Sequence, residues 1–188
     1  MARTYTLRRR AEAQAETRRR IVEAAVELHS TLGPANTTVS MIAEKAGVQR
    51  NTFYAHFPDE RAMVMACSGH VMESDPLPDP EPWAALETPR KRLLTGLSAI
   101  YAWYARHADL LSCVLRDAEH HAITQEITAY RFGPSMARYL SVLGAGLKPK
   151  QRAMLKLALS YHTWRTLTRE AGLKQADAVK AMAETIVT

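Results

Sequence analysis

The sequence TTVSMIAEKAGVQRNTFYAHF, which spans residues 37–57, predicts two short helices joined by a tight turn. Thr38 precedes the first apolar position and is able to cap the first helix with its hydroxyl oxygen. Gly47 follows the last apolar position, where a sharp helix exit needs a positive φ angle. The apolar positions recur with the spacing of one helix face and are Val39, Ile42, Ala43 and Ala46.

The second helix is predicted for residues 49–54, because this run opens with polar side chains and ends in aromatic ones. Ala43 is small enough to let this helix cross close to the first, and Val48 and Phe53 fill the corner between them. These are the requirements of a helix-turn-helix, whose second helix offers its N-terminal side chains to bases in the major groove. The motif therefore predicts double-stranded DNA as a partner.

The positive charge of the chain is concentrated at its N-terminus. The formal net charge is +6, and residues 1–20 hold seven arginines and two glutamates. Arginines beside a helix-turn-helix are the electrostatic footprint of a phosphate-binding surface. The alternative is a solvated terminus that binds nothing.

Composition indicates a globular protein of the cytoplasm. With 47% hydrophobic residues and few glycines and prolines, the chain is able to bury a substantial core. Cys67 and Cys113 form neither a disulfide framework nor a zinc motif, which favours a reducing compartment. No apolar run approaches the roughly 18 residues of a membrane span, and the basic N-terminus lacks the apolar segment of a secretory signal.

Helical periodicity runs through every long segment, so we predict an all-α fold with about nine helices. The segment SDPLPDPEP, residues 74–82, is predicted to be a stiff linker because it holds four prolines. We predict a DNA-binding domain over residues 1–57 and a helical regulatory and dimerisation domain over residues 58–188. Residues 58–73 would form a connecting helix that starts at Pro58.

Three further helices carry specific expectations. The helix before the motif should begin near Glu12 and end at Leu32. A helix that starts near Asp117 should be kinked or broken at Gly133–Pro134. Residues 151–171 should form one helix that is apolar on two faces, so that one face packs in the core and the other against a second subunit.

Residues 18–64 resemble the DNA-binding domain of the TetR family of bacterial transcriptional regulators. The resemblance implies a homodimer in which the last two helices of each subunit form a four-helix bundle. It also implies that two recognition helices read a palindromic operator, and that a small molecule in the second domain releases the DNA. The matching residues are Ile21, Ala24, Ala25, Leu28, Gly33, Thr37–Val39, Ile42–Ala43, Ala46–Val48, Thr52–Tyr54, His56 and Phe57.

The resemblance assigns DNA contacts to individual residues. Thr38, Tyr54 and His56 match positions that contact backbone phosphates in the family. Hydroxyl and ring donors bind phosphate oxygens without reading the base sequence. The start of the recognition helix carries residues suited to base readout, because arginine pairs with guanine and asparagine or glutamine with adenine. These residues are Gln49, Arg50, Asn51 and Thr52.

Two departures from the family concern phosphate contacts. Where the family often places a lysine at the head of the fourth helix, this chain has Glu60, and Arg61 is the candidate replacement. The N-terminal extension is long, and Arg8, Arg9 and Arg10 are expected to form an arm in the adjacent minor groove.

The second domain offers weaker candidates. Aromatic and polar residues that could line an effector cavity, or simply form the core, are Trp103, Tyr104, Tyr130, Met136, His162 and Trp164. Candidate dimer-interface residues are Leu155, Leu159, His162, Thr166, Val179, Met182 and Ile186.

Other functional classes are less well supported. Asp117, Glu119 and His120–His121 suggest a metal site, but a di-metal bundle needs two Glu-x-x-His units and two further carboxylates, so we predict no metal. No phosphate-binding loop, nucleophile elbow or metalloprotease motif is present in the sequence, so we predict neither cofactor nor enzymatic activity. A DNA-binding regulator without small-molecule control remains open, as does, more remotely, a helical enzyme or metal-binding bundle with a basic head.

Overall fold

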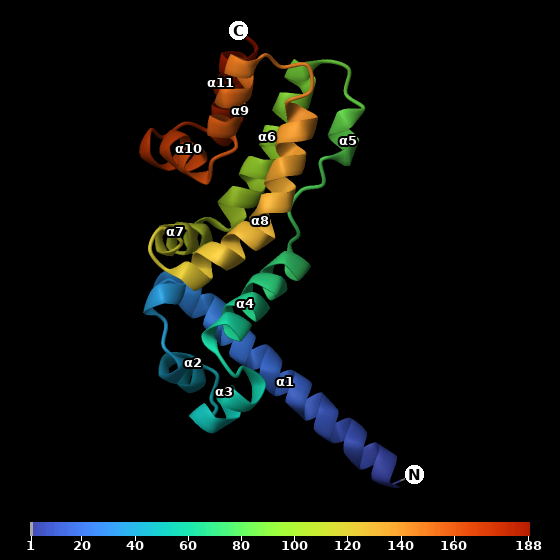
Figure 1. Cartoon of the computed structure of the whole chain (residues 1–188), viewed down its shortest axis with the longest axis vertical. Helices are drawn as coiled ribbons and strands as arrows, with labels where there is room; N and C mark the ends of the chain where they lie inside the picture. Colours follow the sequence, from blue (N-terminus) through green and yellow to red (C-terminus); the bar gives the residue numbers. More distant parts are fainter. Residues whose placement is uncertain (1) are drawn as a thin grey trace. The chain divides into compact units, whose positions relative to one another are not determined.

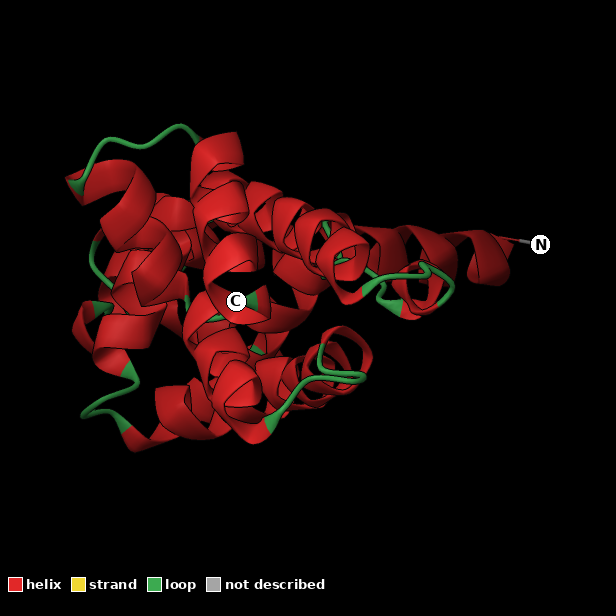
Figure 2. Ribbon diagram, turned by 90° about the horizontal axis from the view of Figure 1, so that it is seen from above, coloured by secondary structure: helices red, strands yellow, loops and turns green. Residues whose placement is uncertain are grey.

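The computed structural model describes residues 2–188, and within that range the chain consists of helices and loops (Figures 1 and 2). A 3-10 turn, η1 (Pro34–Asn36), and a π-helical turn, η2 (Thr166–Glu170), accompany the α-helices. The α-helices are α1 (Ala2–Thr31), α2 (Val39–Lys45), α3 (Arg50–His56), α4 (Glu60–Ser74), α5 (Glu81–Ala84), α6 (Pro89–Arg106), α7 (Ala108–Asp117), α8 (Ala122–Leu143), α9 (Pro149–Ala158), α10 (Tyr161–Arg165) and α11 (Gln175–Val187).

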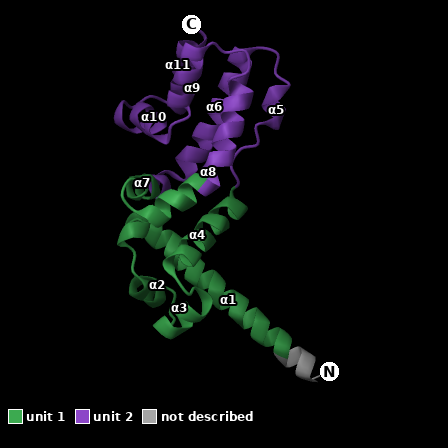
Figure 3. Ribbon diagram, in the orientation of Figure 1, with its two compact units in different colours: residues 1–75, 112–129 green, residues 76–111, 130–188 purple. Residues whose placement is uncertain are grey.

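The chain divides into two compact units, coloured separately in Figure 3. Unit 1 comprises the residues up to Asp75 together with Ser112–Ala129, and unit 2 comprises Pro76–Leu111 and Tyr130–Thr188. Unit 1 therefore holds the helix-turn-helix and also a segment from the middle of the chain. The predicted boundary after residue 57 stays a prediction. Residues 58–75 and 112–129, which belong to the predicted second domain, are grouped with unit 1.

Unit 1 is built around the C-terminal half of α1, which packs against α2 and α4. Ile21 and Ala25 are fully buried, as their spacing in the sequence predicted. The core of unit 1 is completed by Val22, Ala24, Ile42, Ala46, Phe53, Phe57, Met63 and Cys67.

Unit 2 is centred on α6, which packs against α11 and also contacts α5 and α10. Its apolar stripe is fully buried, and Leu143 from α8 and Leu155 from α9 share the same core. Gly96 allows this packing, because an added Cβ there would lie 2.6 Å from a Leu143 methyl carbon. The stripe on α6 consists of Leu93, Leu97, Ile100 and Tyr101.

The all-α class and the helix-turn-helix are confirmed, but several predicted helix ends were wrong. Helix α1 begins at Ala2 rather than near Glu12. Helix α4 begins at Glu60 rather than at Pro58, because Asp59 caps it by accepting a hydrogen bond from the Ala62 N–H. Helix α8 begins at Ala122 rather than near Asp117.

Helix α8 also continues through Gly133 and Pro134, so the predicted break is wrong, whereas the alternative of a kink there stays a prediction. Proline removes the hydrogen bond to the carbonyl four residues earlier, which here belongs to Tyr130. Tyr130 is 62% exposed, so water can hydrate the carbonyl that has lost its partner.

The predicted helix over residues 151–171 is broken, which is the largest difference from expectation. Helix α9 ends at Ala158, α10 runs from Tyr161 to Arg165, and η2 follows. Two buried tyrosines on α6 stabilise the break: Tyr101 donates to the Ala158 carbonyl at 2.9 Å and Tyr104 to the Leu159 carbonyl at 2.6 Å. The hydroxyls satisfy carbonyls that a continuous helix would bond internally.

Candidate nucleic-acid interface

The helix-turn-helix is shaped by local hydrogen bonds. The Thr38 hydroxyl accepts from the Met41 N–H at 3.3 Å and so caps α2. At the other end of α2, Gly47 has a φ of 64°. The Gly47 N–H bonds the Glu44 carbonyl and the Val48 N–H bonds the Ala43 carbonyl, which is the Schellman pattern of a helix end.

Helix α3 is anchored by its apolar residues and exposes its polar start. Phe53 is 1% exposed and its ring lies 5.7 Å from that of the fully buried Phe57. Gln49, the N-cap residue, and Arg50 and Asn51 at the start of the helix are exposed. Because the anchor fixes the helix orientation, these three side chains lie exposed at the start of α3, where the predicted base contacts would be made. Thr52 and His56 are half-buried, and Tyr54 is 44% exposed.

Two arginines of α1 hold the ends of the motif helices, and sequence reasoning did not identify this role. Arg18 lies 4.2 Å above the Phe57 ring centroid and donates to the His56 carbonyl at 3.1 Å. Arg20 donates to the Ala46 carbonyl at 3.2 Å. Cations favour helix C-termini, so both arginines stabilise the motif. Their partners lie 26 and 38 residues away, so no local pattern could have revealed them.

The N-terminal arginines lie on helix α1. Arg8 forms an ion pair with Glu12 at 2.8 Å, and its side chain is 80% exposed. Arg9 and Arg10 are also exposed. Any contact that these residues make with DNA would therefore start from a helix, and the expected arm in the minor groove stays a prediction.

The start of α4 carries the candidate replacement for the phosphate-binding lysine. Arg61 pairs with Glu126 of α8 at 2.6 Å, and Glu60 lies 3.2 Å from the Nε2 of His121. The hydrogen bond from Arg61 lowers the pKa of the Glu126 carboxyl, and the same bond raises the pKa of Arg61. Arg61 is therefore engaged by a neighbouring helix.

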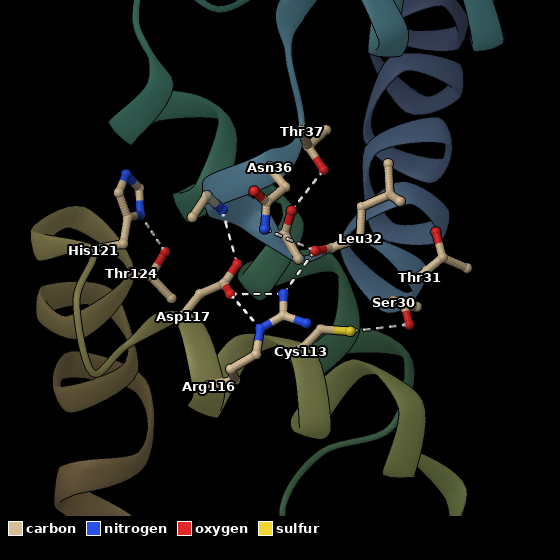
Figure 4. A network of polar contacts seen from close by, with 12 residues as sticks. Ser30, Thr31, Leu32, Asn36, Thr37, Cys113, Arg116, Asp117, His121 and Thr124 are labelled. Carbon is tan, nitrogen blue, oxygen red and sulfur yellow. Dashed lines mark hydrogen bonds and ion pairs between the residues drawn. The ribbon is translucent and has the colours of Figure 1, made fainter.

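Asp117 joins the end of α7 to the turn that leads into the motif (Figure 4). It is fully buried, accepts from the Ala35 N–H at 2.9 Å and pairs with Arg116. Arg116 in turn donates to the Leu32 carbonyl at 2.7 Å. We call this cluster the Asp117 corner. Through it, two residues at the end of α7 hold the turn that precedes α2.

The residues suggested as metal ligands are used differently. Asp117 is bonded to Arg116 and Ala35, and His121 contacts Thr124 through Nδ1 at 2.7 Å and Glu60 through Nε2. Glu119 and His120 are exposed. Among the described residues no group of three potential ligands gathers at one point.

Three of the candidate effector residues lie together in unit 2. Trp103, Tyr104 and Trp164 are buried, and the Tyr104 ring lies 6.2 Å from each of the two indole rings. Burial raises the pKa of the Tyr104 hydroxyl. Tyr130 and His162 are exposed, whereas Met136 is half-buried. The buried three form part of the core.

Most of the candidate dimer residues are buried within a single chain. Leu155, Leu159, Val179, Met182 and Ile186 are at most 8% exposed. His162 and Thr166 are exposed on α10 and η2. The predicted dimer interface remains a prediction, and only these last two residues are accessible to a second subunit without rearrangement.

The comparison with known sequences concerns the motif. Residues 21–67 match the sequence profile of a family described as bacterial regulatory proteins, tetR family. The HTH-type transcriptional regulator SrpR of Pseudomonas putida is 42% identical over 72 residues, which are 37% of this chain and 33% of that protein. The HTH-type transcriptional regulator TtgR, also of Pseudomonas putida, is 43% identical over 68 residues, 36% of this chain and 32% of that protein. The chain thus matches about a third of the length of these relatives.

The comparison with solved structures covers both units. The fatty acid degradation regulator FadR of Bacillus halodurans superposes with a TM-score of 0.66 at 15% identity, over 91% of this chain and 94% of that chain. The regulator FadR of Bacillus subtilis, solved in complex with stearoyl-CoA, gives a TM-score of 0.60 at 19% identity, over 90% and 97%. At these identities the likeness shows the fold. Among the described helices, none combines the length and apolar character needed to cross a membrane.

Proposed function

We propose that the chain, whose residues 21–67 match the profile of the TetR family of bacterial transcriptional regulators, is a DNA-binding repressor of the cytoplasm that a small molecule releases from a palindromic operator. The observation that carries the proposal is the exposed start of α3 above a buried Phe53 anchor. This arrangement presents polar side chains to DNA at a fixed angle. It needs no catalytic centre, and we propose none.

The exposed residues divide into two classes of contact. Arg50 would read guanine through O6 and N7, and Asn51 or Gln49 would read adenine through N6 and N7, with Thr52 beside them. Thr38, Tyr54 and His56 would hold phosphates and fix the register. Arg8, Arg9 and Arg10 on α1 would add sequence-independent attraction to the backbone.

A homodimer would supply the second half of the reading head. Two copies of α3 would then lie roughly 34–36 Å apart, or a multiple of that distance, to enter successive major grooves. The exposed His162 and Thr166 are the candidate contacts that need no rearrangement of unit 2.

The small-molecule effector is supported by the family and by the stearoyl-CoA bound to the FadR of Bacillus subtilis. The buried aromatic residues Trp103, Tyr104 and Trp164 would form the wall of an effector site. Their tight packing equally supports the second candidate, a DNA-binding regulator controlled by a protein partner or acting constitutively. Thermal stabilisation of the protein by a small molecule, coupled to loss of DNA binding, separates the two candidates.

The experiment that tests DNA binding is a mobility-shift and fluorescence-anisotropy assay on duplex fragments from upstream of the chain's own gene. We expect one fragment to bind in preference to random DNA. Asn51→Ala should weaken binding to that fragment by about 1–3 kcal/mol and leave random-DNA affinity nearly unchanged. Arg152→Ala, an exposed arginine of unit 2, is the control that should change neither.

The arginines of α1 are tested by the same assay at varied salt. Replacing Arg8, Arg9 and Arg10 by alanine should weaken binding to all sequences and flatten the salt dependence, by about 0.9 in slope for each phosphate that is no longer neutralised. An unchanged slope would remove these residues from the interface. Absence of salt-sensitive binding to every fragment would count against DNA binding altogether.

A further inference from the structure

The ion pair between Arg61 and Glu126 joins the helix that follows the recognition helix to α8. The Arg61 guanidinium holds Glu126 through two nitrogens, with Nη2 at 2.6 Å and Nε at 3.2 Å from Oε1. Both side chains are more than half exposed, at 56% and 55%. A side-by-side arrangement of this kind matches the geometry in which arginine binds either carboxylate or phosphate.

Arg61 is the first cation in the sequence after α3. Between them lie Phe57, Pro58, the capping Asp59 and Glu60, so the head of α4 carries two negative charges before its first positive one. Two carboxylates at this place repel a DNA backbone. The guanidinium of Arg61 is the group that can offset this repulsion, provided that it is not neutralised by Glu126.

The strength of the pair permits exchange. An exposed ion pair contributes little free energy, because water already screens both charges. The Asp117 corner differs, since Asp117 is fully buried and bonded to a backbone N–H. Within unit 1, the middle segment of the chain therefore contacts the turn before α2 through the buried Asp117 corner, and it contacts the start of α4 through the exposed pair of Arg61 and Glu126.

We propose that Arg61 and Glu126 form an exchangeable phosphate site, in which a DNA phosphate displaces Glu126 as the partner of Arg61. The inference rests on the proposed DNA binding and adds a residue, Glu126, that competes with the operator. Glu126 lowers the affinity for DNA because it pairs with the Arg61 guanidinium that a DNA phosphate would otherwise bind. Any shift of the start of α8 toward or away from α4 changes how much of Arg61 is available, so α8 sets the strength of this contact.

The test compares Glu126→Gln with Glu119→Gln on the full chain. Glu119 is exposed, lies two residues after Asp117 and forms no ion pair with Arg61. The Glu119→Gln variant therefore removes the same charge without freeing the Arg61 guanidinium. The probe is a short random-sequence DNA duplex, because phosphate contacts do not depend on sequence. Dissociation constants are measured by anisotropy between about 50 and 200 mM salt.

We expect Glu126→Gln to tighten binding by about two- to fivefold beyond Glu119→Gln, the range expected for release from an exposed ion pair. The slope of log K against log salt should steepen by up to about 0.9, the value for one added phosphate contact. Arg61→Gln should cost more in the Glu126→Gln background than in the wild type, because only there is the guanidinium free from the start.

Two results would overturn the proposal. One is an equal effect of Glu126→Gln and Glu119→Gln, which would reduce the effect to net charge. The other is a gain that survives Arg61→Gln, which would exclude exchange at this residue. Circular dichroism of each variant shows that the fold is kept. Failure of the proposed function has a separate signature, because the wild-type chain would then show no salt-dependent binding to the duplex.

Discussion

Gly33 occupies a position that tolerates no side chain. Its φ is 91°, a left-handed value that favours glycine, and an added Cβ would overlap the Oδ2 of Asp117. The missing side chain lets the Asp117 carboxylate reach the Ala35 N–H. One glycine in the turn before α2 thus allows a residue 84 positions later to hold the approach to the motif.

Gly33→Ala should therefore destabilise unit 1 by about 3 kcal/mol or more, since it combines backbone strain with a clash against a buried carboxylate. Gly47→Ala is the matched control. Gly47 also has a positive φ, but an added Cβ there would meet only Arg20, at 3.9 Å. Its cost should be the strain alone, about 1–2 kcal/mol. Urea unfolding measures the loss in free energy of unfolding for both variants. Equal losses would show that the Asp117 corner rearranges around the new side chain without further destabilisation.

The burial of His29 predicts how the free energy of unfolding changes with pH. It is 4% exposed, and burial lowers its pKa from 6.5 to about 4, with Asp117 acting in the opposite direction. Between these values the unfolded chain binds a proton that the folded chain does not. Stability should therefore fall by up to about 3 kcal/mol as pH drops from 6.5 to 4, and show no further loss from this residue below 4.

The measurement for His29 is urea unfolding at several pH values, with His29→Gln as the reference. Other titrating groups are common to both proteins, so the difference between the two curves reports His29 alone. A constant difference across this range would mean that the imidazole reaches solvent in the folded state.

The break between α9 and α10 shows how an irregular helix is stabilised. Ser160 starts α10 by accepting from the His162 N–H at 3.2 Å, while Tyr101 and Tyr104 satisfy the carbonyls where α9 stops. The π-helical turn η2 then continues the chain after Arg165. Apolar periodicity over residues 151–171 predicted one helix. Periodicity carries no information about hydroxyl donors supplied by α6, so it could not reveal the break.

Removing these hydroxyls should destabilise unit 2. Tyr101→Phe and Tyr104→Phe each leave a buried carbonyl without its donor, which costs about 1–3 kcal/mol. Tyr130→Phe is the control, because Tyr130 is 62% exposed and its loss should cost nothing measurable. Thermal unfolding followed by circular dichroism compares the three variants. A neutral Tyr104→Phe would show that water replaces the hydroxyl at the break.

Two helices contribute to both compact units. Helix α7 has residues on each side of the division at Leu111–Ser112, and α8 on each side of the division at Ala129–Tyr130. The stability of unit 1 therefore depends on residues from the middle of the chain. If the proposed effector binds unit 2, α7 and α8 would connect its site covalently to unit 1.

A fragment of residues 1–75 tests this dependence. It lacks Asp117 and Arg116, so the Ala35 N–H loses its acceptor and the Leu32 carbonyl loses the Arg116 donor, while it keeps the Asn36 side-chain amide. At about 1 kcal/mol for each missing hydrogen bond, the fragment should melt roughly 10 °C or more below the full chain. An unchanged melting temperature would show that the N-terminal segment is an independent domain.

Prediction succeeded where the determinants are close in sequence. The cap at Thr38, the turn at Gly47 and the buried stripe around Ile21 follow from residues within a few positions of one another. The predicted DNA contacts are exposed or half-buried on the motif, and their roles on DNA stay predictions. Prediction failed for the helix over residues 151–171, where distant tyrosines act.

The sequence alone determined the all-α class and the helix-turn-helix, because helical periodicity, caps and turn glycines act over a few residues. Tertiary structure decided which charges are available and which segments belong together. Arg61 is paired with Glu126, and Ser112–Ala129 joins unit 1, through contacts between residues that are far apart in the chain. Such pairings depend on the path of the folded backbone, and no local pattern in the sequence encodes that path.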